Sequence, residues 1–285
     1  MNVPRSLLFV PGGRPDMVAK APRSGPDAVA VDLEDAVAPG DKEAARASAV
    51  AAVGELAGGE GDRVGTLLLV RVNPPGTPWF DDDVEAVVGT RAGVVLPKYE
   101  EPAQLADLRE RVGDRPVVVG IETARGVARA RELLGEPGLV AGYFGAEDFI
   151  ASVGGRRTSS SREVLFARSE VLLAARLGGV GALDQAVVNV REEAFFRTDA
   201  AEGRDLGYDG KICIHPTQVT LAHEVFTPSE EEVAHARDVV EAGRAGVGVV
   251  NGEMVDDVHL RMAAAVLARA GDAARGSAGR EGVDP

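Results

Sequence analysis

Residues 28–35 read AVAVDLED, a short apolar run that ends in the acidic residues Asp32, Glu34 and Asp35. The apolar part lacks strict alternation of polar and apolar side chains, which is typical of a strand covered on both faces in a parallel sheet. The same pattern recurs along the chain in short runs that are rich in Val, Ile and Leu. The sequence therefore predicts eight strands, at 6–10, 28–33, 66–72, 93–97, 116–121, 139–144, 182–188 and 211–215.

Longer charged and amphipathic stretches separate these runs. Eight strands that alternate with helices indicate an α/β protein, and we expect a (β/α)8 TIM barrel with a short C-terminal helical extension. A doubly wound open sheet is the competing architecture, but its dinucleotide-binding version has little support because no Gly-x-Gly-x-x-Gly follows the first strand. The predicted helices are at 41–56, 101–112, 125–134, 163–177 and 191–206.

The expected barrel occupies residues 1–226, and a C-terminal extension follows at 227–270. Ser229 and the glutamates after it predict the start of a helix, with Ser229 as the N-cap. The extension is too short to fold alone, so we expect it to pack on the barrel or on a neighbouring subunit. Residues 271–285 are rich in Gly, Ala and charged residues and predict a flexible tail.

The composition of the 285 residues excludes several classes of protein. The chain has 31 basic and 45 acidic residues and a formal net charge of −14, which argues against nonspecific nucleic-acid binding. The single Cys213 rules out an intrachain disulfide and a cysteine-based zinc site, and the 4 histidines have no His-Glu-x-x-His spacing. No apolar run is long enough for a membrane span, and the first residues lack the apolar segment of a signal peptide. We therefore expect a soluble cytoplasmic protein with no nucleic-acid or membrane partner.

Ionisable residues follow several predicted strands, at the end of a (β/α)8 barrel where catalytic residues lie. Acids held close together are costly unless they share a cation or a proton, and hard oxygen ligands of this kind favour Mg²⁺. For any single acid, a helix N-cap or a surface ion pair is the alternative. Besides the acids of 28–35, these residues are Arg71, Lys98, Glu122, Glu147 and Asp148.

Arg71 lies inside an apolar strand run, so its guanidinium group must have a partner. One interpretation is that it binds the carboxylate of an anionic substrate through a planar, bidentate fork. The other is a structural salt bridge with one of the acids that end the second predicted strand.

Some further residues allow two interpretations. Cys213 alternates with apolar residues, which favours a buried and inert thiol. His215 is either a capping or a catalytic residue, and residues 154–161 (GGRRTSSS) form either a phosphate-binding lid or a solvated loop. A basic group near the N-terminus either docks an anionic cofactor or lies on a solvated helix face. Its members are Arg5, Arg14, Lys20 and Arg23.

A set of short motifs resembles, in the same order, the citrate lyase β-subunit-like group of the HpcH/HpaI aldolase superfamily. This group includes malyl-CoA, citramalyl-CoA and related acyl-CoA lyases. No single motif is decisive, but the ordered set is highly specific. The motifs are RSLLFVPG at 5–12, VDLEDAV at 31–37, VRVN at 70–73, LPK at 96–98, ETARG at 122–126, GAED at 145–148 and IHP at 214–216.

The resemblance implies a TIM barrel in which Glu122 and Asp148 hold Mg²⁺, with Mn²⁺ as an alternative, and Arg71 binds a 2-oxo acid. It implies that the metal is supported, through waters or hydrogen bonds, by Asp32, Glu34 and Asp35. It also places a coenzyme A thioester substrate against the first barrel units. The matching residues there are Arg5, Phe9, Lys20 and Lys98.

The stretch GEMVD at 252–256 resembles the family's C-terminal element, whose aspartate reaches the active site of a neighbouring subunit. The resemblance thus gives Asp256 a catalytic role and implies a homo-oligomer, either a trimer or a hexamer built as a dimer of trimers. The usual proline two residues later is Val258 here, and Asp257 adjoins it, so both aspartates stay candidates. The alternative role is an N-cap of the following helix.

The implied reaction is Mg²⁺-dependent cleavage of a 3-hydroxyacyl-CoA thioester into a 2-oxo acid and an acyl-CoA, or the reverse Claisen-type condensation. One alternative is a citrate lyase β subunit that acts on a citryl group held by an acyl-carrier protein and yields oxaloacetate. Another is a malate-synthase-like enzyme that also hydrolyses the thioester. A non-catalytic scaffold is the least favoured, because it would not require Arg71, Glu122 and Asp148. The residues do not identify the acyl group or the oxo acid.

Overall fold

The computed structural model describes residues 3–58, 65–243, 248–251 and 253–278. The chain divides into two compact units, one from Val3 to His223 and one that begins at Glu224. The division falls within helix α11 (Pro216–Phe226), whose last residue is the expected end of the barrel. Among the described residues, no helix is long and apolar enough to cross a membrane.

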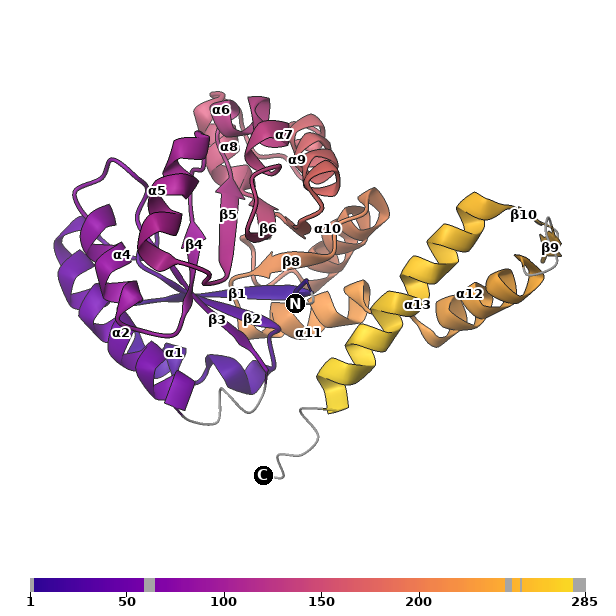
Figure 1. Ribbon diagram of the computed structural model, residues 1–285, viewed down its shortest axis with the longest axis horizontal. Coiled ribbons are helices and arrows are strands. Elements are labelled where there is room, and N and C mark those ends of the chain that lie inside the picture. Colours follow the sequence, from indigo (N-terminus) through magenta and orange to yellow (C-terminus); the bar gives the residue numbers. More distant parts are fainter. Residues whose placement is uncertain (1–2, 59–64, 244–247, 252, 279–285) are drawn as a thin grey trace. The chain divides into compact units, whose positions relative to one another are not determined.

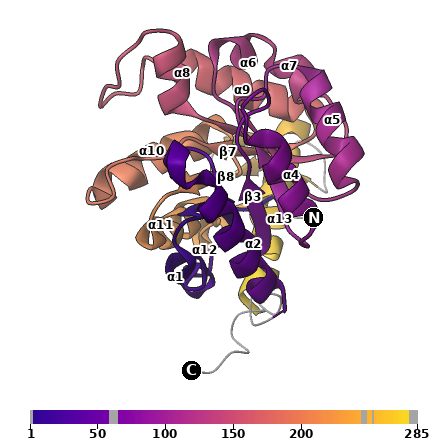
Figure 2. The ribbon, with the colours of Figure 1, turned by 90° about the vertical axis from the view of Figure 1, so that its left-hand side faces the viewer.

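The parallel strands of the first unit close into a barrel in chain order, with β8 paired to β1. Helices lie outside the ring of strands (Figures 1 and 2). The (β/α)8 barrel is therefore confirmed, and the open sheet is excluded. The strands are β1 (Ser6–Pro11), β2 (Ala28–Asp32), β3 (Leu67–Arg71), β4 (Gly93–Leu96), β5 (Val117–Ile121), β6 (Leu139–Phe144), β7 (Gly181–Asp184) and β8 (Gly210–Cys213).

The last two strands end earlier than the apolar runs suggested. Strand β7 stops at Asp184 and β8 at Cys213. The amide of Ile214 donates to the Gln218 side chain instead of to a neighbouring strand, so the chain leaves the sheet there and turns into α11. An apolar run indicates burial rather than pairing, which is why these strand ends were misplaced.

Helices occur in all five predicted stretches, although residues 125–134 form two short helices. Other helices span few turns and offer too short a hydrophobic period to be predicted. The helices in the predicted stretches are α2 (Lys42–Gly58), α5 (Pro102–Val112), α6 (Ala124–Ala128), α7 (Ala130–Leu133), α9 (Leu165–Gly178) and α10 (Glu193–Leu206). Apart from α11, those not predicted are α1 (Pro15–Val18), α4 (Phe80–Val88), α8 (Ala146–Ser152) and the 3₁₀ helices η1 (Ala21–Ser24) and η2 (Pro39–Asp41).

A buried cluster of four charges, which we call the balanced cluster, joins the barrel wall to two helices. It consists of Arg168 on α9, Asp184 at the end of β7, Asp199 on α10 and Lys211 in β8, all at most 2% exposed. The Lys211 ammonium lies 2.7 Å from Asp184 Oδ2 and 2.5 Å from Asp199 Oδ2. The Arg168 Nη2 atom donates to Asp184 Oδ2 over 2.6 Å. Two cations thus compensate two anions away from solvent, which makes burial of the four charges tolerable.

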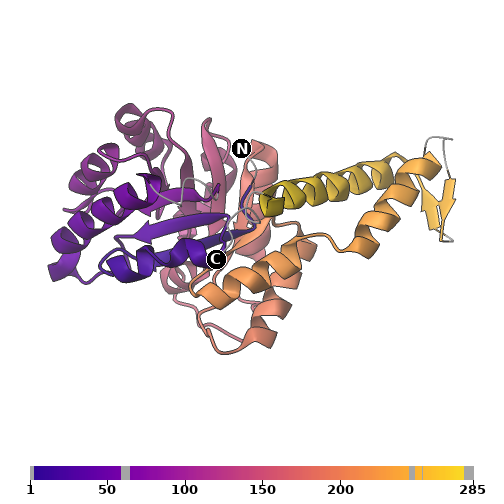
Figure 3. The ribbon, with the colours of Figure 1, turned by 90° about the horizontal axis from the view of Figure 1, so that it is seen from below.

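The second unit contains two helices joined by a hairpin. Helix α12 (Glu230–Gly243) begins with the predicted Ser229 N-cap, because the Glu232 amide donates to Ser229 Oγ and the Ser229 amide to Glu232 Oε2. Strands β9 (Gly248–Val250) and β10 (Glu253–Val255) pair antiparallel. Helix α13 (Asp257–Ala278) packs beside α12 (Figure 3).

Helix α13 continues further than the sequence suggested. Of the expected flexible tail at 271–285, residues 271–278 form the end of α13, and residues 279–285 lie outside the described residues. Alanines and the absence of proline let the helix extend across two glycines.

Candidate functional site

A cavity of 380 Å³ opens at the carboxyl ends of the barrel strands. One part of its lining is apolar, from residues such as Val10, Pro11, Ala186 and Ile214. The other part carries the predicted ionisable residues. Of these, Asp32, Asp35, Arg71, Glu122, Glu147 and Asp148 line the cavity, together with Phe9 and Tyr143.

Arg71 and Asp32 are register partners at the ends of β3 and β2, which brings their side chains together. The Nε and Nη2 atoms of Arg71 each donate to an Asp32 oxygen over 2.7 Å, and Nη1 lies 2.9 Å from Glu34 Oε2. Burial lowers the pKa of Arg71, but the charges of Asp32 and Glu34 outweigh this and hold it well above its usual range. The structural salt bridge that the sequence left open is therefore present, while Arg71 still faces the cavity.

Two aromatic rings pack next to Arg71, one against its guanidinium group and the other against the first ring. The guanidinium carbon lies 4.8 Å from the centre of the Phe9 ring, and the Phe9 and Tyr143 rings meet edge to face at 6.1 Å. Phe9, predicted to contact coenzyme A, is thus a cavity residue that orients the guanidinium plane. Tyr143 was not predicted as a site residue, because an aromatic side chain within an apolar run is indistinguishable from core.

Glu122 follows β5 directly and is fixed through one of its two oxygens. Its Oε1 accepts the backbone N–H of Lys98 over 2.7 Å and the Tyr143 hydroxyl over 3.3 Å. A Cβ atom at residue 145 would lie 2.4 Å from Glu122 Oε2, so the Gly145 of the GAED motif makes room for this carboxylate. Burial raises the pKa of Glu122, Arg71 lowers it and the nearby Asp148 raises it further, with a net upward shift.

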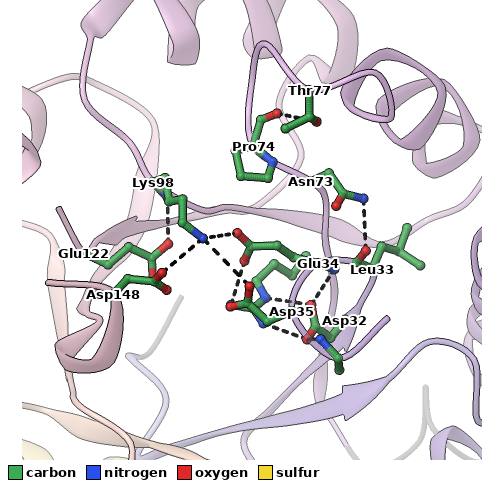
Figure 4. Close-up of polar contacts among 12 residues, drawn as sticks. Asp32, Leu33, Glu34, Asp35, Asn73, Pro74, Thr77, Lys98, Glu122 and Asp148 are labelled. Atoms are coloured by element: carbon green, nitrogen blue, oxygen red, sulfur yellow. Dashed lines mark hydrogen bonds and ion pairs between the residues drawn. The ribbon is translucent and has the colours of Figure 1, made fainter. Parts of the chain in front are cut away.

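Lys98 lies between two groups of acids, Glu34 and Asp35 on one side and Glu122 and Asp148 on the other (Figure 4). Its ammonium is 2.5 Å from Glu34 Oε1, 3.4 Å from Asp148 Oδ1 and 3.9 Å from Asp35 Oδ1. The pKa of Glu34 is raised to about 7. Burial is the largest cause, Glu122 and Asp35 raise the pKa further, and Arg71 opposes the shift. The partners of Lys98 in the structure are carboxylates, and its contact with coenzyme A stays a prediction.

Glu122 and Asp148 fit a Mg²⁺ site of the two-carboxylate kind. Within the described part of the chain, no group of three or more His, Cys, Asp or Glu is arranged to hold a metal. Mg²⁺ needs only one or two carboxylates and keeps waters or substrate oxygens for its other positions. Both carboxylates line the cavity, and Glu122 Oε2 accepts no hydrogen bond from the described residues. The donor set therefore suits the ion that the sequence predicted.

Two residues that the sequence did not single out brace the loop that carries Glu34. The buried Lys42 ammonium donates to the backbone oxygens of Leu33 and Glu34 and to Asn73 Oδ1, over 2.7–2.8 Å. Asn73 Nδ2 also donates to Leu33 O (Figure 4). In the sequence, Lys42 opens a helix and is indistinguishable from a solvated lysine, so no signal could have revealed it.

Two predicted coenzyme A contacts lie away from this cavity. Arg5 precedes β1, at the opposite end of the barrel, and its Nε and Nη2 atoms donate to Asp27 over 2.9 and 3.0 Å. Its contact with coenzyme A stays a prediction, and its partner in the structure is this carboxylate. Lys20 is exposed between α1 and η1 and is not part of the cavity lining.

Three remaining residues show local roles. Asp256 caps α13, since its Oδ1 accepts the Val258 amide over 2.9 Å and the His259 amide over 3.3 Å. His215 is exposed and accepts the Thr217 amide at the start of α11. Cys213 is fully buried, and burial raises the pKa of its thiol to about 12, which confirms the inert thiol.

The loop at 154–161 is anchored beside the cavity rather than fully solvated. Arg157 Nη1 donates to Gln185 Oε1 over 3.0 Å, and Arg157 Nε lies 3.3 Å from Glu147 Oε1. Gln185 donates in turn to Asp199 of the balanced cluster. The loop is thereby connected to the cavity edge on one side and to the buried charges on the other.

The chain is similar to known proteins over most of its length. A family model described as HpcH/HpaI aldolase/citrate lyase matches residues 5–216. The chain is 45% identical over 291 residues to a citrate lyase subunit beta-like protein of Deinococcus radiodurans, covering 94% of this chain and 99% of that protein. It is 34% identical over 273 residues to a (3S)-malyl-CoA thioesterase of Cereibacter sphaeroides, covering 93% and 94%. The structure of CitE from Mycobacterium tuberculosis with magnesium, acetoacetate and coenzyme A superposes with a TM-score of 0.82 and 35% identity, over 94% of this chain and 98% of that one.

Proposed function

Because the chain belongs to the HpcH/HpaI aldolase/citrate lyase family, we propose that it is a Mg²⁺-dependent carbon–carbon lyase. Its substrate would be a 3-hydroxyacyl-CoA thioester, which it cleaves to a 2-oxo acid and an acyl-CoA or forms by the reverse condensation. The observation that carries the proposal is the convergence of Arg71, Glu122 and Asp148 on one cavity. Magnesium, acetoacetate and coenzyme A bound together by the CitE relative support it.

The residues of this chain divide the chemistry among them. Glu122 and Asp148 would hold Mg²⁺, which would supply a Lewis acid for the oxo-acid oxygens. Arg71 faces the same cavity and stabilises negative charge that develops on oxygen during cleavage. Although burial lowers the pKa of Lys98, Glu34 and the other acids raise it above its ordinary value. A lysine that stays protonated is not a Schiff-base nucleophile, so the site uses the metal route.

Asp256 is our candidate for the general base, supplied by the C-terminal unit of a second copy in a trimer or hexamer. It sits between β10 and α13, where the apolar side chains of Val249, Met254 and Met262 are 63–70% exposed. Exposed apolar groups of this kind are typical of a surface that packs on a partner. An aspartate delivered with that surface accepts the hydroxyl proton of the substrate. Asp257 is the alternative candidate for the general base. Gly252 of the GEMVD stretch lies outside the described residues.

Mixing two inactive variants tests the shared site. Asp256→Ala and Glu122→Gln, each inactive alone, should regain part of the activity when co-assembled, because some sites then receive an intact set from two chains. Asp257→Ala is the matched variant and keeps its activity if Asp256 is the base. Mixed oligomers without activity, or a fully active monomer in sedimentation, would contradict the assignment.

Two relatives favour alternatives to this proposal. In one the acyl group is carried by an acyl-carrier protein instead of coenzyme A, and in the other the thioester is also hydrolysed. The likeness to a citrate lyase subunit beta-like protein supports a citryl group held on an acyl-carrier protein, which would yield oxaloacetate. The likeness to a (3S)-malyl-CoA thioesterase supports hydrolysis of the thioester after carbon–carbon chemistry.

One assay separates these activities. The purified chain is incubated with Mg²⁺ and either a panel of 3-hydroxyacyl-CoA thioesters or a citryl-loaded acyl-carrier protein, and the released oxo acid and free thiol are measured separately. Oxo acid without free coenzyme A supports the lyase, and free coenzyme A indicates hydrolysis. Turnover of only the citryl-carrier substrate would replace the proposal with the citrate lyase role, and no turnover of any substrate would refute it.

A further inference from the structure

Lys98 contacts both groups of acids in the cavity, through different atoms. Its backbone N–H holds Glu122 Oε1, while its ammonium lies nearest to Glu34 and next nearest to Asp148 (Figure 4). The residue adopts φ +49°, in the left-handed region that non-glycine residues seldom occupy. This conformation lets one residue fix Glu122 from the backbone and reach Glu34 with its side chain.

Glu34 would otherwise be available as a third carboxylate. Its side chain is 4% exposed and has two cationic neighbours, Arg71 and Lys98. Arg71 makes its two-bond fork to Asp32 and approaches Glu34 only through Nη1, 2.9 Å from Oε2, whereas Lys98 is the partner of Oε1 at 2.5 Å. Because Glu34 and Asp148 flank the same ammonium, loss of that ammonium would leave two carboxylates facing one gap.

The number of carboxylates at such a site affects which cation it prefers. Mg²⁺ is held by one or two carboxylates and retains waters, whereas Ca²⁺ takes six to eight oxygen ligands in flexible arrangements. Each added negative charge also raises the affinity for any divalent cation. A third carboxylate would therefore favour Ca²⁺ more than Mg²⁺.

We propose that Lys98 is a positioning residue that reserves Glu34, so that the cation site keeps two carboxylates and prefers Mg²⁺ over Ca²⁺. The inference rests on the proposed function, because it assumes that Glu122 and Asp148 hold the metal. Lys98 contributes without touching substrate: it neutralises Glu34, keeps it away from the cation and holds Glu122 in place.

Calorimetric titration of the full chain with Mg²⁺ and with Ca²⁺, without substrate, tests this role. Lys98→Met should bind Ca²⁺ about tenfold more tightly, equivalent to about 1.4 kcal/mol, with a smaller gain for Mg²⁺. The double variant Lys98→Met/Glu34→Gln should lose this gain, because the third carboxylate is gone. The matched control is Arg91→Met, which removes one positive charge from an exposed position before β4, at the end of that strand opposite Lys98.

An unchanged Ca²⁺/Mg²⁺ affinity ratio in folded Lys98→Met would overturn the inference, as would a gain that survives in the double variant. If Lys98→Met does not fold, Glu34→Gln decides. In this variant the Lys98 ammonium loses its nearest anion and stays near Asp148, so the affinity for Mg²⁺ should fall. An unchanged Mg²⁺ affinity would overturn the inference. Absence of Mg²⁺ binding by the unaltered chain would instead refute the proposed function.

Discussion

Two charged clusters in the same barrel differ in one respect, the ratio of acids to bases. The balanced cluster has two acids and two bases, all buried and in contact with one another. The cavity cluster has five acids and two bases, namely Asp32, Glu34, Asp35, Glu122 and Asp148 with Arg71 and Lys98.

The pKa of Asp199 in the balanced cluster and the pKa values of Glu34 and Glu122 in the cavity cluster are shifted in opposite directions. Burial alone would raise the pKa of Asp199, but Lys211 and Arg168 lower it below its usual range. In the cavity, burial and neighbouring acids raise the pKa of both Glu34 and Glu122. The charges of the balanced cluster thus compensate one another, whereas the excess of acid in the cavity cluster leaves negative charge that a bound cation can compensate. This contrast separates a structural cluster from a functional one.

The largest expected effect follows from removing the acids that face the cation. Glu122→Gln or Asp148→Asn should lower turnover by more than about 10³-fold, because orientation of the oxo acid and stabilisation of developing charge are both lost. The melting temperature should change little, since neither acid belongs to the balanced cluster. Steady-state kinetics and thermal melts measure the two quantities, and Glu110→Gln on the exposed face of α5 is the matched control. Full activity in excess chelator would contradict the metal assignment.

Breaking the balanced cluster should instead reduce stability and leave turnover nearly unchanged. Lys211→Met leaves Asp184 and Asp199 with too little positive charge in a buried site and should reduce the free energy of unfolding by about 3–5 kcal/mol. Urea denaturation measures this loss. The kcat of the remaining folded protein should stay close to normal. A variant as stable as the parent chain would show that the cluster is not compensated in the way the geometry indicates.

The sequence predicted the cavity better than the balanced cluster, for a physical reason. Acids at strand ends, such as Asp32 and Glu122, break an apolar run and are conspicuous. Lys211 and Arg168 are single charges in a strand and a helix, and their partners come from distant elements. The same holds for Arg5, whose partner in the fold no local sequence pattern reveals. Its pairing with Asp27 depends on the register of β1 against β2, which no local pattern encodes.

An arginine-to-lysine change at matched positions sharpens the comparison. Arg71 and Arg168 each make a two-bond fork, to Asp32 and Asp184 respectively. Lysine keeps the charge and loses the fork. Arg71→Lys should lower kcat/KM about 10- to 100-fold, whereas Arg168→Lys should lower the melting temperature and leave kcat/KM near that of the parent chain. Equal kinetic losses in the two variants would remove the functional distinction between the clusters.

The smallest expected effect concerns the Arg5–Asp27 ion pair at the opposite end of the barrel from the cavity. Burial raises the pKa of Asp27, but hydrogen bonds from Arg5 and the nearby His223 lower it, to about 2 from an ordinary value of 3.8. The unfolded chain then binds the proton more readily, so this group stabilises the fold above the ordinary pKa and loses its contribution as the pH falls through 2. The shift corresponds to about 2 kcal/mol at neutral pH and roughly half of that at pH 3. The stability difference between the parent chain and Asp27→Asn, measured by urea denaturation, should shrink accordingly between pH 7 and pH 3. Asp16→Asn, which affects the exposed pair with Arg14, should show a much smaller pH dependence, because solvent screens that pair. A difference for Asp27→Asn that stays constant over this range would mean that Asp27 stabilises the barrel through its shape and hydrogen bonds and not through its charge.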